Sequence, residues 1–152
     1  MAITSGNSYR DLRASIQREK DQRVLEHQAN IAKSGRMAFS MAAGQKSVLN
    51  LIAQGDSWFD YPLPFPTHTD VVAHLKNLPS MHPEVLCLAH HGESAEDMLG
   101  VTKLHELVDN LNKPANGKFD AILFSGGGND LVGNQFRLWL GMLCATPIKA
   151  RA

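Results

Sequence analysis

The chain has 152 residues, 43% of them hydrophobic, which suits one globular domain with a substantial core. Its 15 basic and 15 acidic residues balance to zero formal charge, and no basic stripe typical of nucleic-acid binding occurs. The amino-terminal segment lacks the apolar core of a secretory signal, and the longest later apolar stretch is too short to cross a bilayer. We therefore expect a cytoplasmic protein that binds neither nucleic acid nor membranes.

Residues 9–33 are rich in Arg, Glu, Gln and Lys and predict a moderately amphipathic helix. Its apolar residues are Leu12, Ile16, Val24, Leu25 and Ile31. Ser34 and Gly35 predict the end of this helix. We divide the chain into a helical extension, residues 1–46, and an α/β domain, residues 47–152. The extension either packs a weak apolar stripe on the domain or binds a partner.

From residue 48 onward, short apolar runs alternate with helical patterns. Strands are expected at 48–53, 84–89 and 120–124, and helices at 69–78, 95–112 and 131–143. Strands separated by helices form right-handed crossovers, so this pattern predicts an α/β domain with a parallel sheet. The runs are continuously apolar, which is typical of strands buried on both faces.

The helix expected at 95–112 has the clearest boundaries. Ser94 and Asp97 have the spacing of a capping box, and Pro114 limits the other end. The apolar face expected to pack on the sheet consists of Val101, Leu104, Val108 and Leu111. Ser94 is therefore better explained as a helix cap than as a nucleophile. The two cysteines, Cys87 and Cys144, lack metal-site spacing and are expected to be small buried residues.

Each predicted strand ends in a short polar motif. The motifs are Gly55-Asp56-Ser57-Trp58, His90-His91-Gly92-Glu93-Ser94 and Ser125-Gly126-Gly127-Gly128-Asn129-Asp130. Because the carboxyl ends of parallel strands share one edge of a sheet, Ser57, Gly92 and Asn129 should converge there. An activated serine can attack an ester carbonyl, and a glycine N–H and an asparagine amide can stabilise the resulting oxyanion. Asp56 and Asp130 are expected to hold their turns by accepting hydrogen bonds from backbone N–H groups.

These motifs, in this order and spacing, resemble the first three sequence blocks of the SGNH hydrolases, or GDSL esterases. The resemblance covers about residues 48–143. It implies a flavodoxin-like sheet of order 2-1-3-4-5 and hydrolysis of a small ester. Ser57 would be the nucleophile, and its N–H, the Gly92 N–H and Asn129 would form the oxyanion hole. No cofactor or metal is implied.

The chain departs from the family pattern in two places. Trp58 replaces the leucine of the family name, at a position that does not touch the chemistry. The fourth strand, the fifth strand and the closing Asp-x-x-His block are absent, and no histidine stands three residues after an aspartate. We therefore expect a sheet truncated to about three strands and an incomplete catalytic site. The alternative is an inactive remnant that serves as a binding or oligomerising module.

Two substitutes for the missing histidine remain open. His74 shares a helix face with Asp70, and His90 and His91 adjoin the expected oxyanion glycine. A metal ion held by His90, His91 and Glu93 is not expected, because neighbouring residues of an extended run point to opposite faces.

The truncation would also leave the third strand with an apolar free edge. The possible outcomes are self-association, a partner chain that supplies the missing half, and poor solubility. The loop at residues 61–66, rich in proline and aromatic residues, either lines a substrate pocket or makes a rigid connection.

Overall fold

The computed structural model describes residues 5–40, 48–61, 70–79, 81, 83–132, 138, 140 and 141. Its sheet consists of three parallel strands in the order β2-β1-β3. The strands are β1 (Asn50–Gln54), β2 (Glu84–Cys87) and β3 (Ala121–Phe124). The central strand β1 pairs on both sides, so that Ile52 lies opposite Leu86 of β2 and Ile122 of β3. The expected α/β class, the parallel sheet and the 2-1-3 order are confirmed.

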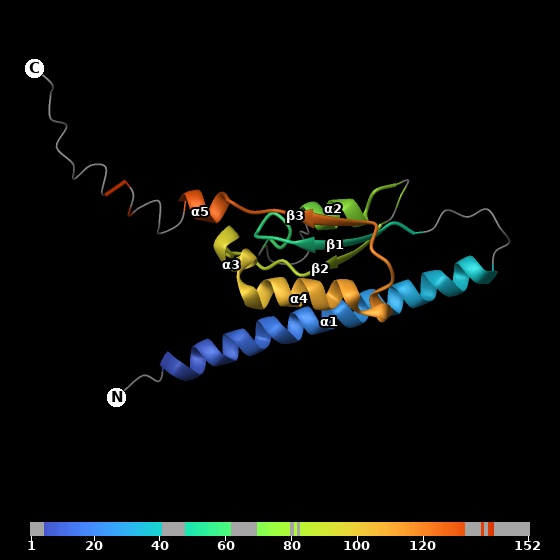
Figure 1. The fold of residues 1–152 in the computed structure, drawn as a ribbon, viewed down its shortest axis with the longest axis horizontal. Coiled ribbons are helices and arrows are strands. Elements are labelled where there is room, and N and C mark those ends of the chain that lie inside the picture. The colour runs from blue at the N-terminus through green and yellow to red at the C-terminus, as the bar shows by residue number, and fades with distance from the viewer. Residues whose placement is uncertain are drawn as a thin grey trace, which may run out of the picture.

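Helices cover both faces of this sheet (Figure 1). They are α1 (Ser5–Ser40), α2 (Val71–Lys76), α3 (Ala95–Leu99), α4 (Val101–Asn112) and α5 (Gly128–Val132), with a short 3-10 turn, η1, at Pro114–Asn116. Figure 1 shows α1 and α4 side by side along one face of the sheet, with α2 on the opposite side.

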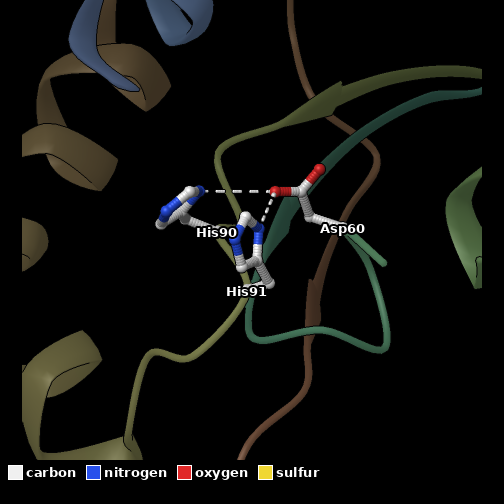
Figure 2. Close-up of side chains that lie close together, drawn as sticks. All are labelled: Asp60, His90 and His91. Carbon is white, nitrogen blue, oxygen red and sulfur yellow. Dashed lines mark ion pairs between the residues drawn. The ribbon is translucent and has the colours of Figure 1, made fainter. Parts of the chain in front are cut away.

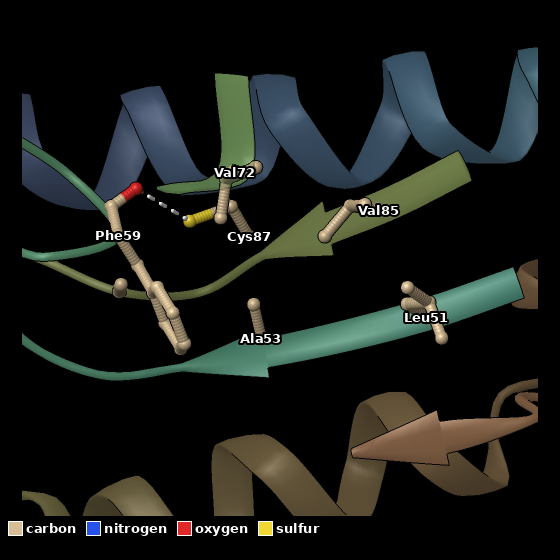
Figure 3. Packing of buried hydrophobic residues seen from close by; sticks show 7 residues of the cluster. Leu51, Ala53, Phe59, Val72, Val85 and Cys87 are labelled. Atoms are coloured by element: carbon tan, nitrogen blue, oxygen red, sulfur yellow. Dashed lines mark hydrogen bonds between the residues drawn. The ribbon is translucent and has the colours of Figure 1, made fainter. Parts of the chain in front are cut away.

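The core is divided between the two faces of the sheet, because alternate strand residues point in opposite directions. On the α2 face, seven buried residues pack together (Figure 3): Leu51, Ala53, Phe59, Val72, Val85, Cys87 and Ala89. On the other face, Ile52, Leu86 and Leu88 pack against partly buried residues of α1 and α4. Cys87 is buried, as expected, and its thiol lies 3.5 Å from the carbonyl oxygen of Phe59.

The three strands differ in burial. Every residue of β1 is buried, and β2 is buried except for its first residue. In β3, however, Ile122 is 52% and Phe124 is 53% exposed. The expectation that all three strands are buried on both faces is therefore wrong for β3. Strand β3 lies at the edge of the sheet among the described residues, which agrees with the expectation of an apolar free edge.

Helix α1 and the pair α3 and α4 depart most from their expected bounds, and α5 begins at Gly128, three residues before the expected start. Helix α1 continues through Gly35 to Ser40, because a glycine inside a helix costs about 1 kcal/mol but does not have to end it. The helix expected at 95–112 is instead two helices, α3 and α4, separated by Gly100 in an extended conformation. The capping box of Ser94 and Asp97 at the start of α3 is confirmed.

Helix α4 packs through only part of the face expected from the sequence. Val101, Leu104 and Val108 are exposed, whereas Leu107 and Leu111 contact the buried residues of the sheet. Of the four residues of the expected face, only Leu111 packs on the buried residues of the sheet. Glu106, next to Leu107, lies 3.4 Å from the buried Lys20 of α1.

Helix α1 packs through a partly polar stripe. Lys20 and His27 are buried, and Val24 between them contacts the sheet. Leu12 and Leu25, two of the apolar residues expected to form the packing stripe, are exposed. The His27 ring stacks on Phe119 with centroids 5.6 Å apart. The helix is thus attached to the domain largely by buried polar side chains.

Several expectations fall outside the described residues. They concern most of the helix at 131–143, the 61–66 loop beyond Tyr61, and Cys144. None of the helices searched in the described part of the chain combines the length and apolar character needed to span a membrane.

Candidate functional site

Three turns follow the carboxyl ends of the strands and meet over the end of β1. Pairing between the first two turns continues beyond the strands, since the His90 N–H donates to the Gly55 carbonyl at 3.2 Å. On the other side of β1, the Ser125 N–H donates to the Gln54 carbonyl, also at 3.2 Å. The expected gathering of the three motifs at one edge of the sheet is therefore present.

A buried aspartate joins the first turn to the third. The carboxylate of Asp56 accepts hydrogen bonds from the Ser125 hydroxyl at 2.9 Å and from the Trp58 N–H at 3.1 Å. The same hydroxyl accepts one from the Asp56 N–H at 3.2 Å. Asp56 thus holds its own turn by a backbone hydrogen bond, as expected, and also fastens it to the turn after β3.

The third turn also reaches the second. The side-chain amide of Asn129 donates to the carbonyl of Glu93 at 2.7 Å, and the Asp130 carboxylate accepts from the Ala95 N–H at 2.8 Å. Because β2 and β3 lie on opposite sides of β1, these contacts cross above the central strand. Asp130 thus accepts a backbone N–H as expected, but one at the start of α3 rather than in its own turn.

Ser57 is half-buried in the turn after β1 and lines a cavity of about 430 Å³. The described lining residues are Ser57, Trp58, Tyr61, Asp70, Val71 and His74. The Val71 N–H donates to the Trp58 carbonyl at 3.0 Å, which holds the start of α2 against this turn. His74, one of the three histidines considered above as substitute bases, therefore lines the same cavity as Ser57.

The two expected oxyanion residues lie elsewhere on the edge. Gly92 and Asn129 are not among the described residues that line the Ser57 cavity. Gly92 has a φ of +82°, a conformation that favours glycine, and a Cβ there would meet no atom within 4 Å. Asn129 uses one amide hydrogen on Glu93, and the structure shows no acceptor for its second hydrogen among the described residues.

A second group of side chains gathers where the chain continues beyond the ends of β1 and β2, as Figure 2 shows. One oxygen of Asp60, Oδ2, lies 3.5 Å from Nδ1 of His90 and 3.6 Å from Nδ1 of His91. The centroids of the two rings are 4.2 Å apart. The expectation that neighbouring histidines cannot face one point is therefore wrong, because both residues follow the end of β2 and are no longer in an extended strand.

Helix α1 supplies the cation that balances this group. Arg23 donates to Oδ1 of Asp60 at 2.7 Å and to the Ala89 carbonyl at 3.1 Å. Burial alone would raise the pKa of Asp60, but the charge and hydrogen bond of Arg23, together with His90 and His91, lower that pKa below its usual value. Burial, reinforced by the neighbouring His91, lowers the pKa of His90. Asp60 is thus charged and His90 neutral at pH 7.

A network of buried charges anchors α1 to the second turn. Lys20 lies 3.8 Å from Glu93 and 3.4 Å from Glu106, and Lys103 pairs with both carboxylates. Burial lowers the pKa of Lys20, with a further decrease from its hydrogen bond with Lys103. The turn that contains Gly92 is therefore positioned by α1 and α4 as well as by the sheet.

Sequence reasoning missed Asp60 and Arg23. Asp60 follows the Gly55-Asp56-Ser57 motif by three residues, so the rule that placed Ser57 at the sheet edge also applies to it. Nothing in the sequence distinguishes Arg23 from the many other charged residues of α1, so its contact with Asp60 could not be predicted. The chain matches no protein-family model, and neither a curated protein nor a solved structure shows significant similarity to it.

Proposed function

We propose that this chain is an SGNH-type serine ester hydrolase that acts on a small carboxylic ester through Ser57. The observation that carries the proposal is the joining of three strand-end turns above β1, through Asp56 to Ser125 and Asn129 to Glu93. This arrangement brings the motifs of the resemblance to one edge of a parallel sheet in their expected order. The cavity beside Ser57 supplies space for a substrate.

In the proposed reaction, the Ser57 hydroxyl attacks the ester carbonyl and its proton passes to a base. The alcohol leaves, and water then hydrolyses the acyl-enzyme. The Gly92 N–H and the second amide hydrogen of Asn129 are the donors proposed for the oxyanion. Neither donor is among the described residues that line the Ser57 cavity. The proposed reaction therefore requires that the ester carbonyl reach both donors when the substrate binds.

His74 is the base that we propose to test. It lines the Ser57 cavity together with Asp70. One Asp70 oxygen, Oδ1, already accepts the Ala73 N–H at 2.7 Å as the cap of α2. A base at His74, one turn after Asp70 on the same helix, differs from the Asp-x-x-His arrangement, so we expect slow turnover. Loss of the histidine from a serine triad costs up to about a millionfold in turnover.

The test combines a fluorophosphonate probe with hydrolysis of p-nitrophenyl acetate. Wild-type protein should be labelled once per chain, and Ser57→Ala should abolish both labelling and the slow hydrolysis. His74→Gln should slow labelling, whereas His105→Gln, which alters an exposed histidine of α4, should leave it unchanged. Labelling that persists in Ser57→Ala would overturn the proposal. Rapid Ser57-dependent hydrolysis would instead refute the incompleteness of the site.

A second candidate function is association with another chain, without catalysis. It is favoured by the exposure of Ile122 and Phe124 on β3. Light scattering during size-exclusion chromatography should then report a mass above that of one chain, and Phe124→Lys should reduce it. A monomer at all concentrations would exclude self-association and leave a different partner chain as the occupant.

A further inference from the structure

We propose that Asp60, His90 and His91 form a binding site for a divalent transition-metal ion, with Zn²⁺ as the best match. The three ligand atoms are Oδ2 of the aspartate and Nδ1 of each histidine, and all lie within 4.8 Å of one another. Figure 2 shows the two rings directed to the same carboxylate oxygen. The inference goes beyond the proposed ester hydrolysis and does not depend on it.

The separations between the ligand atoms suit one ion. Zn²⁺ binds imidazole nitrogen and carboxylate oxygen at about 2.0–2.2 Å, so two ligands at a tetrahedral angle stand about 3.4 Å apart. The nitrogens of His90 and His91 lie 3.5 and 3.6 Å from the Asp60 oxygen. An ion placed among the three atoms therefore needs only small movements of the side chains.

The same distances argue against a role as simple hydrogen bonds. A charge-assisted bond between an N–H and a carboxylate oxygen is usually about 2.7–2.9 Å long. Both contacts to Asp60 exceed that length, and they converge on a single oxygen. By contrast, Arg23 approaches the other oxygen of the same carboxylate to 2.7 Å. The long contacts are thus confined to the side where an ion would sit.

The surroundings hold the ligands in place. Arg23 donates to Oδ1 of Asp60, which leaves Oδ2 directed to the rings, and to the Ala89 carbonyl just before His90. Hydrogen bonds that orient ligands are a regular part of metal sites, and their loss costs about 10- to 100-fold in affinity. Gly92, with its φ of +82°, turns the chain directly after the two histidines.

The ligand set also selects the class of metal. Two imidazoles and one carboxylate favour Zn²⁺ and related transition metals, whereas Mg²⁺ and Ca²⁺ prefer oxygen ligands. The side chain of His91 is 45% exposed, so solvent reaches the site. Three protein ligands with solvent access leave a fourth position for water, as in zinc sites that bind or activate a small molecule.

The experiment uses the full chain without an affinity tag and Zn²⁺ alone. Isothermal titration calorimetry should give one ion per chain, and Co²⁺ in its place should give the intense visible absorption of a four-coordinate site. Asp60→Asn and His91→Gln should each weaken Zn²⁺ binding by more than about tenfold. The matched control, His105→Gln, should bind as the wild type does, because that histidine lies on the exposed side of α4.

Of the ligand variants, His91→Gln is the one expected to disturb the fold least, since this side chain is the most exposed of the three ligands. Its circular dichroism spectrum and urea unfolding curve should match those of the wild type. Absence of Zn²⁺ binding to the wild type would overturn the proposal. Binding of equal strength in Asp60→Asn, His91→Gln and wild type would also overturn it, because the ion would then sit elsewhere.

Discussion

The side-chain amide of Asn129 donates a hydrogen bond to the carbonyl oxygen of Glu93, 2.7 Å away. This contact joins the turns after β3 and β2, which flank the central strand on opposite sides. An asparagine that serves as an oxyanion donor in the proposed reaction therefore also has a structural role, and the two roles use different amide hydrogens.

Substitution of Asn129 should affect stability and catalysis to different degrees. Asn129→Ala should lower the free energy of unfolding by about 1 kcal/mol, the usual net value of one hydrogen bond. Asn129→Asp should lower it further, because a carboxylate would face the Glu93 carbonyl. Urea unfolding measures both effects. In the proposed hydrolysis, either variant should be slower by about 100- to 1000-fold. Equal stability of Asn129→Ala and Asn129→Asp would contradict the assigned hydrogen bond.

The buried pair of Asp56 and Ser125 should behave as a coupled unit. Asp56→Ala removes the acceptor of the Ser125 hydroxyl and of the Trp58 N–H, so it should cost about 1–3 kcal/mol of unfolding free energy. Ser125→Ala removes the hydroxyl that donates to the Asp56 carboxylate and accepts the Asp56 N–H, so it should cost a similar amount. In a double-mutant cycle followed by urea unfolding, the two effects should add to more than the effect of the double variant. Strict additivity would show that the side chains do not interact.

Two glycines should respond to alanine in opposite directions. At Gly55, a Cβ would lie 2.1 Å from the Ser125 hydroxyl oxygen and 2.8 Å from a ring carbon of Phe59, so Gly55→Ala should destabilise by about 1–3 kcal/mol. At Gly35, inside α1, a Cβ would meet nothing within 4 Å. Gly35→Ala should therefore stabilise by up to about 1 kcal/mol through helix propensity. Thermal unfolding of the two variants compares them directly, and a destabilising Gly35→Ala would argue against a continuous α1.

Acid should destabilise the protein partly through His27. Burial lowers the pKa of this histidine below its usual value of 6.5. The unfolded chain then binds a proton more readily than the folded chain, so stability is full above about pH 6.5 and is lost as the pH falls towards the lowered pKa. His27→Leu, which keeps an apolar contact for Phe119, should flatten this part of the profile. Urea midpoints between pH 7 and 5 measure the slope, and an unchanged slope in the variant would assign the acid sensitivity to other groups.

The parallel sheet and the gathering of its turns could be predicted because they depend on local patterns, whereas the 2-1-3 order was expected only from the family resemblance. Apolar runs separated by helices define parallel strands, and a strand end is marked by Gly55, Gly92 or Gly126 in the sequence itself. The packing of α1 could not be predicted in this way. Lys20 and His27 read as solvated residues, and their burial depends on Glu93, Glu106 and Asn116, which are distant in the sequence.

The meeting of Asp60 with His90 and His91 was missed for a related reason. Alternation of side chains applies only while the chain remains extended, and β2 ends at Cys87. Beyond that residue, the directions of two neighbouring side chains depend on the turn conformation, which the residue types alone do not define. The packing of α4 was also missed in part, since Leu107 contacts the sheet and Glu106 beside it pairs with Lys20 of α1, a residue distant in the sequence.

The 2-1-3 order of the sheet has a consequence for how the chain folds during synthesis. Strand β1 needs partners on both sides, and its second partner, at Ala121–Phe124, leaves the ribosome about seventy residues later. Part of the packing of helix α1 also depends on a distant segment, because Gln28 donates a hydrogen bond to Asn116, 88 residues later in the chain. Pairings between such distant segments carry a large loop-closure cost and slow the folding of parallel sheets. The strand that is synthesised first therefore gains its second partner only when the last of the three described strands has been made.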